Sequence, residues 1–393
     1  MKITDSFTEK CVSEKDEIII YGAGVYGEIA HAALEYMGLK PSCFCDLNLA
    51  GQIIYDNYNV IAPSELCNHR DACIILASYN YFYDMLKVCQ ENGCSNYYDM
   101  EYILQLPLIE KNLSGRALGR IKDISGYKEM LQHNPETGKL NLNHIDYVVC
   151  EGCTLKCINC SNLMPYYNKP EILNDEKYMR ALERLLEVVD HVGEIYLIGG
   201  EPFLNPELDK IIYRIYQNPK VGGISIFTNG TIIPGDNVLE AMRYGNVVMQ
   251  VSDYKLEFQK IKELVIKLKE YNIEYVVKDY DTWIDLGNTE KREFTESQIE
   301  NNYRSCFFKI NYTLHRGRLY YCPRSAHGNF LGLVDCNEED YIDFNNIQYS
   351  DVEMRNKMEA FLNNKKPLNA CSYCNGGNLS QRPIKAAIQE AVK

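Results

Sequence analysis

The feature that most constrains the fold is a regular alternation of short apolar segments and amphipathic helical segments over residues 144–277. Five apolar segments begin at residues 144, 194, 223, 247 and 274, with helical periodicity between them. This pattern is typical of a parallel sheet with right-handed crossover connections. Because residues 282–286 offer a sixth strand, we expect an α/β fold with a partial (β/α)6 TIM barrel. Its ligand sites would lie at the C-terminal ends of the strands.

Four cysteines follow the first of these strands: Cys150, Cys153, Cys157 and Cys160. The last three form Cys-x3-Cys-x2-Cys, a spacing that lets three thiolates bind three irons of a 4Fe-4S cluster and leaves the fourth iron open. The alternative is a zinc site built from the pairs Cys150/Cys153 and Cys157/Cys160. Two such pairs usually need a longer spacer before they can converge on one ion, so the spacing favours the cluster.

The second strand ends in Gly199-Gly200-Glu201-Pro202. Three cysteines followed at this distance by Gly-Gly-Glu-Pro resemble the radical SAM superfamily. The resemblance implies that the open iron chelates S-adenosylmethionine (SAM) and that Gly199, Gly200 and Glu201 receive the methionine amino group. Asn159 departs from the superfamily pattern, which usually has an aromatic residue before the last cysteine.

Polar residues also follow the later strands. By the same resemblance, Thr228, Asn229 and Ser252 are candidates for contacts to the ribose or carboxylate of SAM; taken alone, Thr-Asn-Gly is more often a turn. Residues expected to face the substrate or to cover SAM are Lys278, Asp279, Asn159, Asn162, Tyr166 and Tyr167.

The C-terminal region, residues 301–393, carries a second set of thiols. Cys306 and Cys322 outline a β-hairpin, and Cys371-x2-Cys374 follows a helical segment. This arrangement resembles the twitch domain, a truncated SPASM domain, in which four such thiolates hold one auxiliary 4Fe-4S cluster. A zinc site with the same four thiols is the alternative, because sites of four thiolates accept either metal.

Several residues near these motifs have no place in either set of ligands. Cys150 and Cys336 are candidates for a thiol that donates hydrogen to a substrate radical, or are simply buried thiols. His315, Arg316 and His327 lie near the auxiliary hairpin and could meet a substrate, although isolated histidines are more often ordinary surface or core residues.

The N-terminal region, residues 1–105, begins with a strand, Gly22-x-Gly24-x-x-Gly27, a helix, a second strand and Asp46. This order is the fingerprint of dinucleotide-binding sheets and predicts a Rossmann-like parallel sheet. It resembles the nucleotide-sugar-associated modules of surface-polysaccharide enzymes. If a nucleotide or nucleotide sugar binds, the glycines would contact its phosphates and Asp46 a ribose hydroxyl. Alternatively, the glycines only permit close packing.

The connection between these regions and the overall composition limit the remaining possibilities. Residues 106–142 are a basic connector that could pack over the barrel, and Arg116 and Arg120 could meet a phosphate. The barrel would then cover residues 143–300. A net charge of -13 argues against nucleic acid or an anionic membrane as a partner. No signal segment or membrane-spanning run occurs, so the 16 cysteines indicate a reduced cytoplasmic enzyme.

The resemblance implies reductive cleavage of SAM to a 5'-deoxyadenosyl radical that abstracts hydrogen from a substrate carbon, with electrons from a reductant such as flavodoxin or ferredoxin. We expect a nucleotide-linked sugar as substrate, and oxidation, epimerisation or dehydration as the outcome. The first alternative is a maturase of a ribosomal peptide. The second is a non-catalytic iron-sulfur or zinc scaffold or redox sensor.

Overall fold

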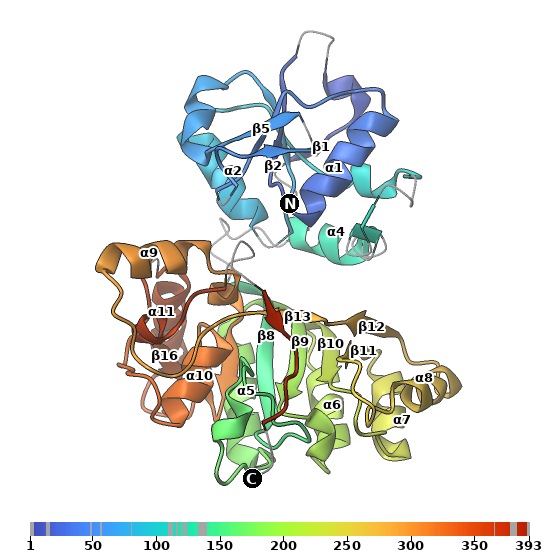
Figure 1. The fold of residues 1–393 in the computed structure, drawn as a ribbon, viewed down its shortest axis with the longest axis vertical. Helices are drawn as coiled ribbons and strands as arrows, with labels where there is room; N and C mark the ends of the chain where they lie inside the picture. Colours follow the sequence, from blue (N-terminus) through green and yellow to red (C-terminus); the bar gives the residue numbers. More distant parts are fainter. Residues whose placement is uncertain are drawn as a thin grey trace. The chain divides into compact units, whose positions relative to one another are not determined.

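The computed structural model describes residues 4–12, 16–47, 49–55, 57–79, 81–108, 113–114, 117–118, 121, 124–132, 140–364, 366–377 and 383–390. The chain divides into two compact units, residues 1–139 and residues 140–393 (Figure 1). No helix among the described residues is long and apolar enough to span a membrane.

The first unit is built on one sheet with the strand order β1-β7-β6-β2-β3-β5-β4. Every neighbouring pair is parallel except β4 and β5. Its elements are β1 (Asp5–Ser6), β2 (Ile18–Tyr21), α1 (Val25–Tyr36), β3 (Cys43–Cys45), β4 (Ile53–Ile54), β5 (Tyr58–Ile61), β6 (Cys73–Leu76), α2 (Phe82–Glu91), β7 (Tyr97–Asp99) and α4 (Ile124–Gln132). The central strands β2 and β6 are buried along their whole length, which is why they read as continuous apolar runs.

Helix α4 belongs to this first unit, whereas the sequence placed it in a connector that could pack over the barrel. Tyr127 of α4 is fully buried in the core of the first unit, and its hydroxyl accepts a hydrogen bond from Met100 N at 3.1 Å. The Tyr83 hydroxyl donates to the carbonyl of Met130 at 2.9 Å. Arg116 and Arg120 lie outside the described residues.

The second unit is built on an eight-stranded sheet with the order β12-β11-β10-β9-β8-β14-β15-β16. The five strands β8 to β12 are mutually parallel, as the alternation predicts. Its strands are β8 (Asn141–Cys150), β9 (His191–Gly199), β10 (Val221–Thr228), β11 (Val248–Asp253), β12 (Tyr275–Asp279), β13 (Thr282–Ile284), β14 (Thr313–His315), β15 (Arg318–Tyr320), β16 (Tyr341–Asp343) and β17 (Pro383–Lys385).

The helices that follow these strands bury one apolar face each. The helices are α5 (Glu176–Val188), α6 (Leu208–Tyr216), α7 (Asp236–Tyr244), α8 (Ile261–Glu270), α9 (Glu296–Ser305), α10 (Pro323–Phe330) and α11 (Asp351–Leu362). Helix α5 begins at Asp175, whose carboxylate accepts a hydrogen bond from Lys177 N at 3.0 Å. Leu182, Leu185 and Leu186 of α5 pack in the same core as the strands. In Figure 1 the helices α5 and α6 run beside the strands of the second unit.

The sixth strand differs from the sequence prediction. Residues 282–284 form β13, which pairs antiparallel with β17 in a separate two-stranded sheet. The position beside β8 is taken by β14, which pairs with β8 in parallel through Thr313↔Asp146 and Leu314↔Tyr147. The reason is that register between distant segments depends on tertiary packing and not on local periodicity. The predicted hairpin, β14 with β15, is therefore continuous with the main sheet.

Candidate metal centres and cofactor site

The loop after β8 brings three of the predicted ligands together. Cys153, Cys157 and Cys160 share one small apolar cluster with Leu155 and Ala387. Burial, with smaller contributions from the neighbouring Cys160, Glu201 and Cys157, raises the pKa of Cys153 to about 12. Burial likewise raises the pKa of Cys157 to about 11. Without a metal these thiols are therefore protonated at neutral pH, and metal binding would release their protons.

N–H groups point at the sulfurs of these cysteines. Leu155 N lies 3.4 Å from Cys153 Sγ, and Gln389 Nε2 lies 3.2 Å from Cys157 Sγ. Asn229 Nδ2 approaches Cys153 Sγ to 3.6 Å. Such donors stabilise thiolates bound to iron.

Among the described residues, no group of three or more His, Cys, Asp or Glu side chains is arranged so that it could hold a metal ion. The donor set of the loop nevertheless fits an iron-sulfur cluster, because three thiols lie together in an apolar region with N–H groups directed at two of them. Thiolates are the ligands of such clusters.

Cys150 lies apart from these three thiols. It is fully buried in the main core of the second unit, and its Sγ is 3.2 Å from Gly152 N. Burial raises its pKa to about 11. Because Cys150 packs in a different cluster from Cys153, Cys157 and Cys160, the structure does not gather the four cysteines of the zinc alternative.

Two glycines at the end of β9 touch the cysteine loop itself. A Cβ atom on Gly199 would lie 2.0 Å from the carbonyl oxygen of Cys150, and one on Gly200 would lie 2.1 Å from that of Gly152. Gly200 N donates to Cys150 O at 3.0 Å, and Glu201 N donates to Gly152 O at 2.8 Å. The two glycines therefore allow the strand end to lie directly against the loop that carries the thiols.

The Glu201 carboxylate is fully buried and accepts several hydrogen bonds. Thr228 Oγ1 donates to its two oxygens at 2.9 and 3.0 Å, Asn229 N donates at 2.9 Å, and Phe203 N donates at 3.3 Å. Burial raises its pKa to about 7, although these hydrogen bonds act in the opposite direction. A cationic group brought close to Glu201 would favour the ionised carboxylate.

Asn229 and Ser252 connect the neighbouring strand ends to this region. The Asn229 amide donates to Thr154 Oγ1 at 3.0 Å and accepts from Thr231 Oγ1 at 2.7 Å. Gln259 bridges two strand ends, because its Nε2 donates to the carbonyls of Asn229 and Ser252 at 2.6 and 2.8 Å. Thr228, Asn229 and Glu201 thus form one network beside the cysteine loop.

The remaining flanking candidates lie in different surroundings. Asn162 donates to the carbonyl of Gly199 at 3.2 Å, and the Tyr167 hydroxyl lies 2.7 Å from His327 Nδ1. Asn159 and Tyr166 are exposed. Asp279 pairs with Lys255 at 2.7 Å, and the Lys278 ammonium lies 4.9 Å from the centre of the Tyr280 ring.

The second set of cysteines lines one pocket. Cys306, Cys322, Cys371 and Cys374 surround it together with apolar residues such as Leu286, Phe308 and Ala370. Ser325 N lies 3.4 Å from Cys322 Sγ, Gly376 N lies 3.3 Å from Cys374 Sγ, and Gly377 N lies 3.2 Å from Cys306 Sγ. Burial raises the pKa of Cys371 to about 12.

Arg324 is the charged residue that lines this four-cysteine pocket. Its side chain is buried, and its Nη2 donates to the carbonyl oxygens of Gly287, at 2.8 Å, and Asn288. Its Nε is buried and has no hydrogen-bond partner among the residues that the structure describes. A buried guanidinium needs a compensating anion, and a thiolate-bound metal centre carries negative charge. The pocket therefore fits a four-thiolate metal centre.

The other candidates near the hairpin form a buried ionic network. The Glu151 carboxylate accepts from Arg316 Nε at 2.7 Å and lies 2.8 Å from His315 Nε2. His327 Nε2 is buried, and no described residue forms a hydrogen bond with it. Cys336 lies in neither group of thiols; its Sγ is 3.5 Å from Asn337 O, and burial raises its pKa to about 12.

The face of the sheet opposite the helices carries a buried carboxyl group, Asp146, that is not among the site residues predicted from the sequence. Asp146 pairs in register with Tyr196, which contacts Phe227 with ring centroids 5.0 Å apart. Burial raises the pKa of Asp146 to about 8, so at neutral pH this carboxyl is largely protonated and can donate a hydrogen bond. The sequence could have indicated this group, because Asp146 is an acidic residue inside an otherwise apolar strand. The prediction considered only residues at the ends of strands.

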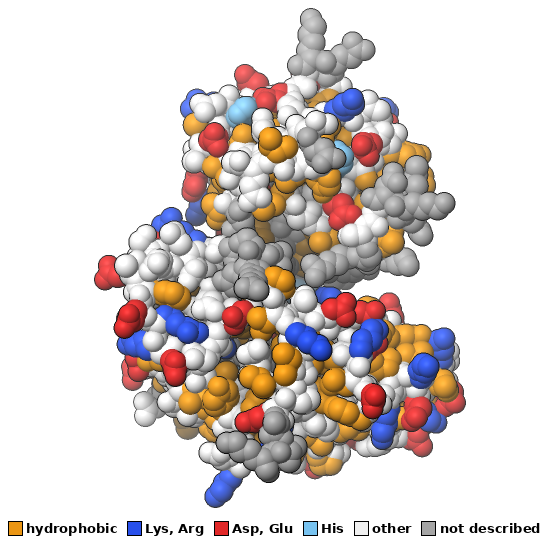
Figure 2. Space-filling model, in the orientation of Figure 1, with side chains coloured by type: hydrophobic (Ala, Val, Ile, Leu, Met, Phe, Trp, Pro, Cys, Tyr) orange, Lys and Arg blue, Asp and Glu red, His pale blue; other side chains and the backbone are white. Residues whose placement is uncertain are grey.

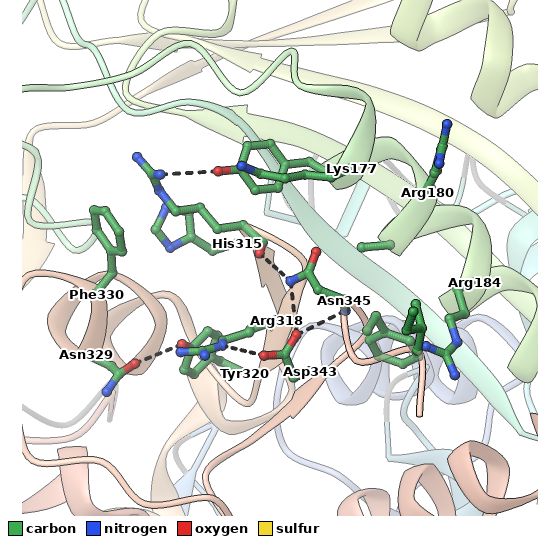
Figure 3. Close-up of a pocket in the computed structure, with 15 residues that line it drawn as sticks. Lys177, Arg180, Arg184, His315, Arg318, Tyr320, Asn329, Phe330, Asp343 and Asn345 are labelled. Carbon is green, nitrogen blue, oxygen red and sulfur yellow. Dashed lines mark hydrogen bonds and ion pairs between the residues drawn. The ribbon is translucent and has the colours of Figure 1, made fainter. Parts of the chain in front are cut away.

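A pocket of about 550 Å³ lies between α5 and the strands β14 to β16 (Figure 3). Asp343 is the acidic residue that lines it, held by Arg318 Nε at 2.9 Å and by the Asn345 amide at 2.9 Å. The cationic side chains that line it are Lys177, Arg180, Arg184, Arg316 and Arg318, beside His315. Several of them have carboxylate partners, including Glu151, Glu171, Asp175 and Glu176.

In the first unit, the three glycines of the predicted fingerprint differ in their surroundings. Gly22 has φ +110, and a Cβ there would lie 2.5 Å from Ala77 O; a Cβ on Gly27 would lie 2.1 Å from Gly22 O. Nothing lies within 4 Å of a Cβ on Gly24, which precedes α1. Asp46 accepts a hydrogen bond from Ala23 N at 2.9 Å. Gly22 and Gly27 thus have a packing role, and Gly24 faces open space.

Comparison with known proteins identifies the segment that carries the cysteine loop. Residues 147–282 match the radical SAM superfamily. The segment is a radical SAM domain. It contains Cys153, Cys157, Cys160 and the Gly199–Glu201 turn.

The curated relatives match parts of the chain. The chain is 33% identical over 96 residues to a GTP 3',8-cyclase of Clostridium acetobutylicum, which is 24% of this chain and 29% of the relative. It is 24% identical over 190 residues to the GTP 3',8-cyclase of Lactiplantibacillus plantarum, covering 37% of this chain and 56% of the relative. Molybdenum cofactor biosynthesis protein 1 of Drosophila melanogaster is 24% identical over 194 residues, covering 47% and 33%.

Two solved structures are also similar. BtrN in complex with AdoMet and 2-DOIA has a TM-score of 0.42 at 16% identity, covering 61% of this chain and 94% of that one. Native anSMEcpe with bound AdoMet has a TM-score of 0.40 at 15% identity, covering 56% and 82%.

Proposed function

We propose that this radical SAM enzyme acts on a nucleotide-linked sugar, with Cys153, Cys157 and Cys160 holding the SAM-binding 4Fe-4S cluster. The observation that carries the site is the contact between the cysteine loop and the Gly199–Glu201 turn, through Gly200 N to Cys150 O at 3.0 Å and Glu201 N to Gly152 O at 2.8 Å. When bound, the cluster and SAM supply a 5'-deoxyadenosyl radical.

The residues around the loop bind and orient the cofactor. In this proposal Glu201 receives the methionine ammonium group, and the hydrogen bonds that Thr228 Oγ1 and Asn229 N donate to its carboxylate beside the loop support that role. Ser252, at the end of β11, is a candidate contact to the SAM ribose. The apolar side chains of Leu155, Tyr254 and Trp283 around the three thiols exclude water.

We also propose that residues 301–393 form a twitch-type domain in which Cys306, Cys322, Cys371 and Cys374 hold one auxiliary 4Fe-4S cluster. Their common pocket supports this assignment, as does the buried Arg324, whose Nε has no hydrogen-bond partner in the described part of the chain. With four protein ligands this cluster has no open iron, so it would accept an electron from the substrate radical, giving oxidation. Flavodoxin or ferredoxin would reduce the SAM-binding cluster. Cys336 and Cys150 are the candidate hydrogen donors if the outcome is epimerisation.

The substrate class rests on two further observations. Ignoring the short edge strand β1, the first unit orders its parallel strands β5-β3-β2-β6-β7, which is the order 3-2-1-4-5 of Rossmann-like dinucleotide-binding sheets. In the second unit, Lys177, Arg180 and Arg184 of α5 line the pocket in a chain of net charge -13; the first two pair with Asp175 and Glu176, and Arg184 donates to the carbonyl oxygens of Asn346 and Tyr349. Phosphate groups pair with such cations, and a pocket of about 550 Å³ suits a nucleotide.

A GTP-like purine nucleotide is the second candidate substrate, because several of the curated relatives are GTP 3',8-cyclases. The chain spans between 28% and 56% of the length of the GTP 3',8-cyclases that it matches. The same pocket would hold either kind of phosphate.

The deciding experiment is anaerobic reconstitution followed by turnover with SAM and dithionite. About eight irons per chain, falling to about four in the Cys306/Cys322/Cys371 triple alanine variant, would support two clusters. A panel of nucleotide sugars and GTP is then compared for substrate-dependent 5'-deoxyadenosine formation. Stimulation by nucleotide sugars supports the proposal, and stimulation by GTP alone replaces it. Bound zinc with intact SAM would overturn the catalytic assignment and favour a scaffold.

A further inference from the structure

Residues 383–390 are far in sequence from the cysteine loop that carries Cys153, Cys157 and Cys160, but they lie against it in the structure. It begins as β17, which pairs with β13, and Ala386 N donates to Asp281 O at 3.0 Å. It then runs antiparallel to the loop: Ile158 N donates to Ile388 O at 2.9 Å, and Glu390 N donates to Lys156 O at 2.8 Å. The backbone on either side of Cys157 thus forms one strand of a short antiparallel ladder.

Both polar atoms of the Gln389 side-chain amide, Oε1 and Nε2, also contact the cysteine loop. Its Oε1 accepts from Lys156 N at 2.8 Å, and its Nε2 donates to Cys157 Sγ at 3.2 Å. The same Nε2 donates to Ala387 O at 2.8 Å, which fixes the orientation of the amide. One side chain therefore positions the loop backbone and directs an N–H group at a predicted iron ligand.

Burial shows that this segment closes the site. Ala387 and Cys157 are 2% and 6% exposed, and they pack with Leu155 in one apolar cluster. Trp283, on the strand that pairs with β17, packs edge-on against Tyr254 with ring centroids 5.5 Å apart. Without residues 386–390, the Cys157 side of the loop would face solvent.

We propose that residues 386–390 are part of the site of the SAM-binding 4Fe-4S cluster. In this proposal Gln389 is a positioning residue that holds the cysteine loop and makes the cluster easier to reduce. The physical reason is that an N–H group directed at a ligand sulfur stabilises the extra negative charge of the reduced cluster. This inference rests on the proposed function only in that Cys157 binds the cluster.

The first test uses the iron-free protein and needs neither cluster nor substrate. The rate constant for alkylation of the Cys157 thiolate by iodoacetamide, taken from the pH dependence of the reaction so that changes in ionisation are separated from changes in access, is measured by mass spectrometry, with Cys153 and Cys160 as internal references. In Gln389→Leu, which loses both polar contacts, we expect the Cys157 rate to rise about tenfold. Gln389→Glu keeps the acceptor for Lys156 N and should remain near wild type. Gln217→Leu, at an exposed position on another surface, is the matched control.

The second test is a redox titration of the reconstituted cluster, followed by electron paramagnetic resonance. Loss of the N–H donor in either Gln389 variant should shift the one-electron reduction equilibrium about tenfold toward the oxidised form, which is about 59 mV. If both Gln389 variants match Gln217→Leu in alkylation and in potential, the inference is wrong. If wild type forms no cluster, the alkylation result still decides the positioning role, and the failure belongs to the proposed function.

Discussion

At the scale of single residues, two buried charges near the cysteines are compensated in different ways. Glu151 follows Cys150 directly and is fully paired, since its carboxylate contacts His315 and Arg316. Among the described residues, the partners of Arg324 in the four-cysteine pocket are carbonyl oxygens, and its Nε has none. The Glu151 charge is therefore compensated by side chains, whereas no carboxylate of the described residues pairs with Arg324.

Glu151→Gln should destabilise the iron-free second unit. Burial alone would raise the pKa of Glu151, but the hydrogen bonds from His315 and Arg316 outweigh it and hold the pKa at about 2. This stabilisation is present above the ordinary value near 4.5 and is lost as pH falls toward 2. We expect a loss of about 3 kcal/mol at pH 7 in urea unfolding, with a weaker pH dependence below pH 4.5. Glu338→Gln, at an exposed acid, should change little; equal behaviour of the two variants would contradict the prediction.

Arg324→Met should weaken the four-thiolate centre more than the centre on the cysteine loop, because the Arg324 charge lowers the pKa of Cys374 more strongly, relative to the other influences, than that of Cys160. Removing a buried cation beside bound thiolates leaves their charge uncompensated, which costs about 3 kcal/mol or more. We expect the reconstituted protein to lose iron from one centre on gel filtration, and Arg324→Lys to recover part of it. Exposed Arg180→Met is the matched control, and full iron retention in Arg324→Met would show that the cation is not needed.

At the scale of elements, the glycines mark where one backbone lies directly against another. Gly199 and Gly200 allow β9 to end against the cysteine loop, while Gly22 and Gly27 allow α1 to begin against β2 and the strand beside it. In each case an added Cβ would overlap a carbonyl oxygen. Close backbone packing therefore explains these four glycines. Of the glycines in the first-unit motif, Gly24 is the one whose role packing does not explain and that a ligand could contact.

Substitution of the first-unit glycines should separate these two roles. Gly22→Ala meets Ala77 O at 2.5 Å in a left-handed backbone conformation, so we expect a loss of stability of roughly 2 kcal/mol or more. Gly24→Ala has open space and should fold normally. If a nucleotide binds at this turn, Gly24→Ala should weaken its binding about tenfold by calorimetry. Normal folding of Gly22→Ala would contradict the packing role.

At the scale of the whole molecule, the two units have separate sheets and separate cores. The described surface of each unit carries acidic and basic side chains interspersed on the face shown in Figure 2. All seven predicted metal-ligating cysteines lie in residues 140–393. The second unit therefore contains both candidate metal centres by itself.

Fragments 1–139 and 140–393 should fold independently. Because each unit buries its own core, we expect each fragment to unfold cooperatively, and fragment 140–393 to bind about eight irons and to cleave SAM at a rate within about threefold of the full chain. Circular dichroism, iron analysis and 5'-deoxyadenosine formation check this. Loss of iron binding from fragment 140–393 would show that the first unit is needed for the metal centres.

The sequence by itself determined the parallel strands β8 to β12, the position of the thiols at a strand end and the strand–glycine–helix order of the first unit. These features are local, since apolar periodicity and cysteine spacing act over a few residues. Only the tertiary structure decided that β14 and not residues 282–286 lies beside β8, that Asp146 is buried within a strand, and that Gln389 reaches Cys157. These contacts join residues far apart in the chain, and their register depends on how the whole unit packs.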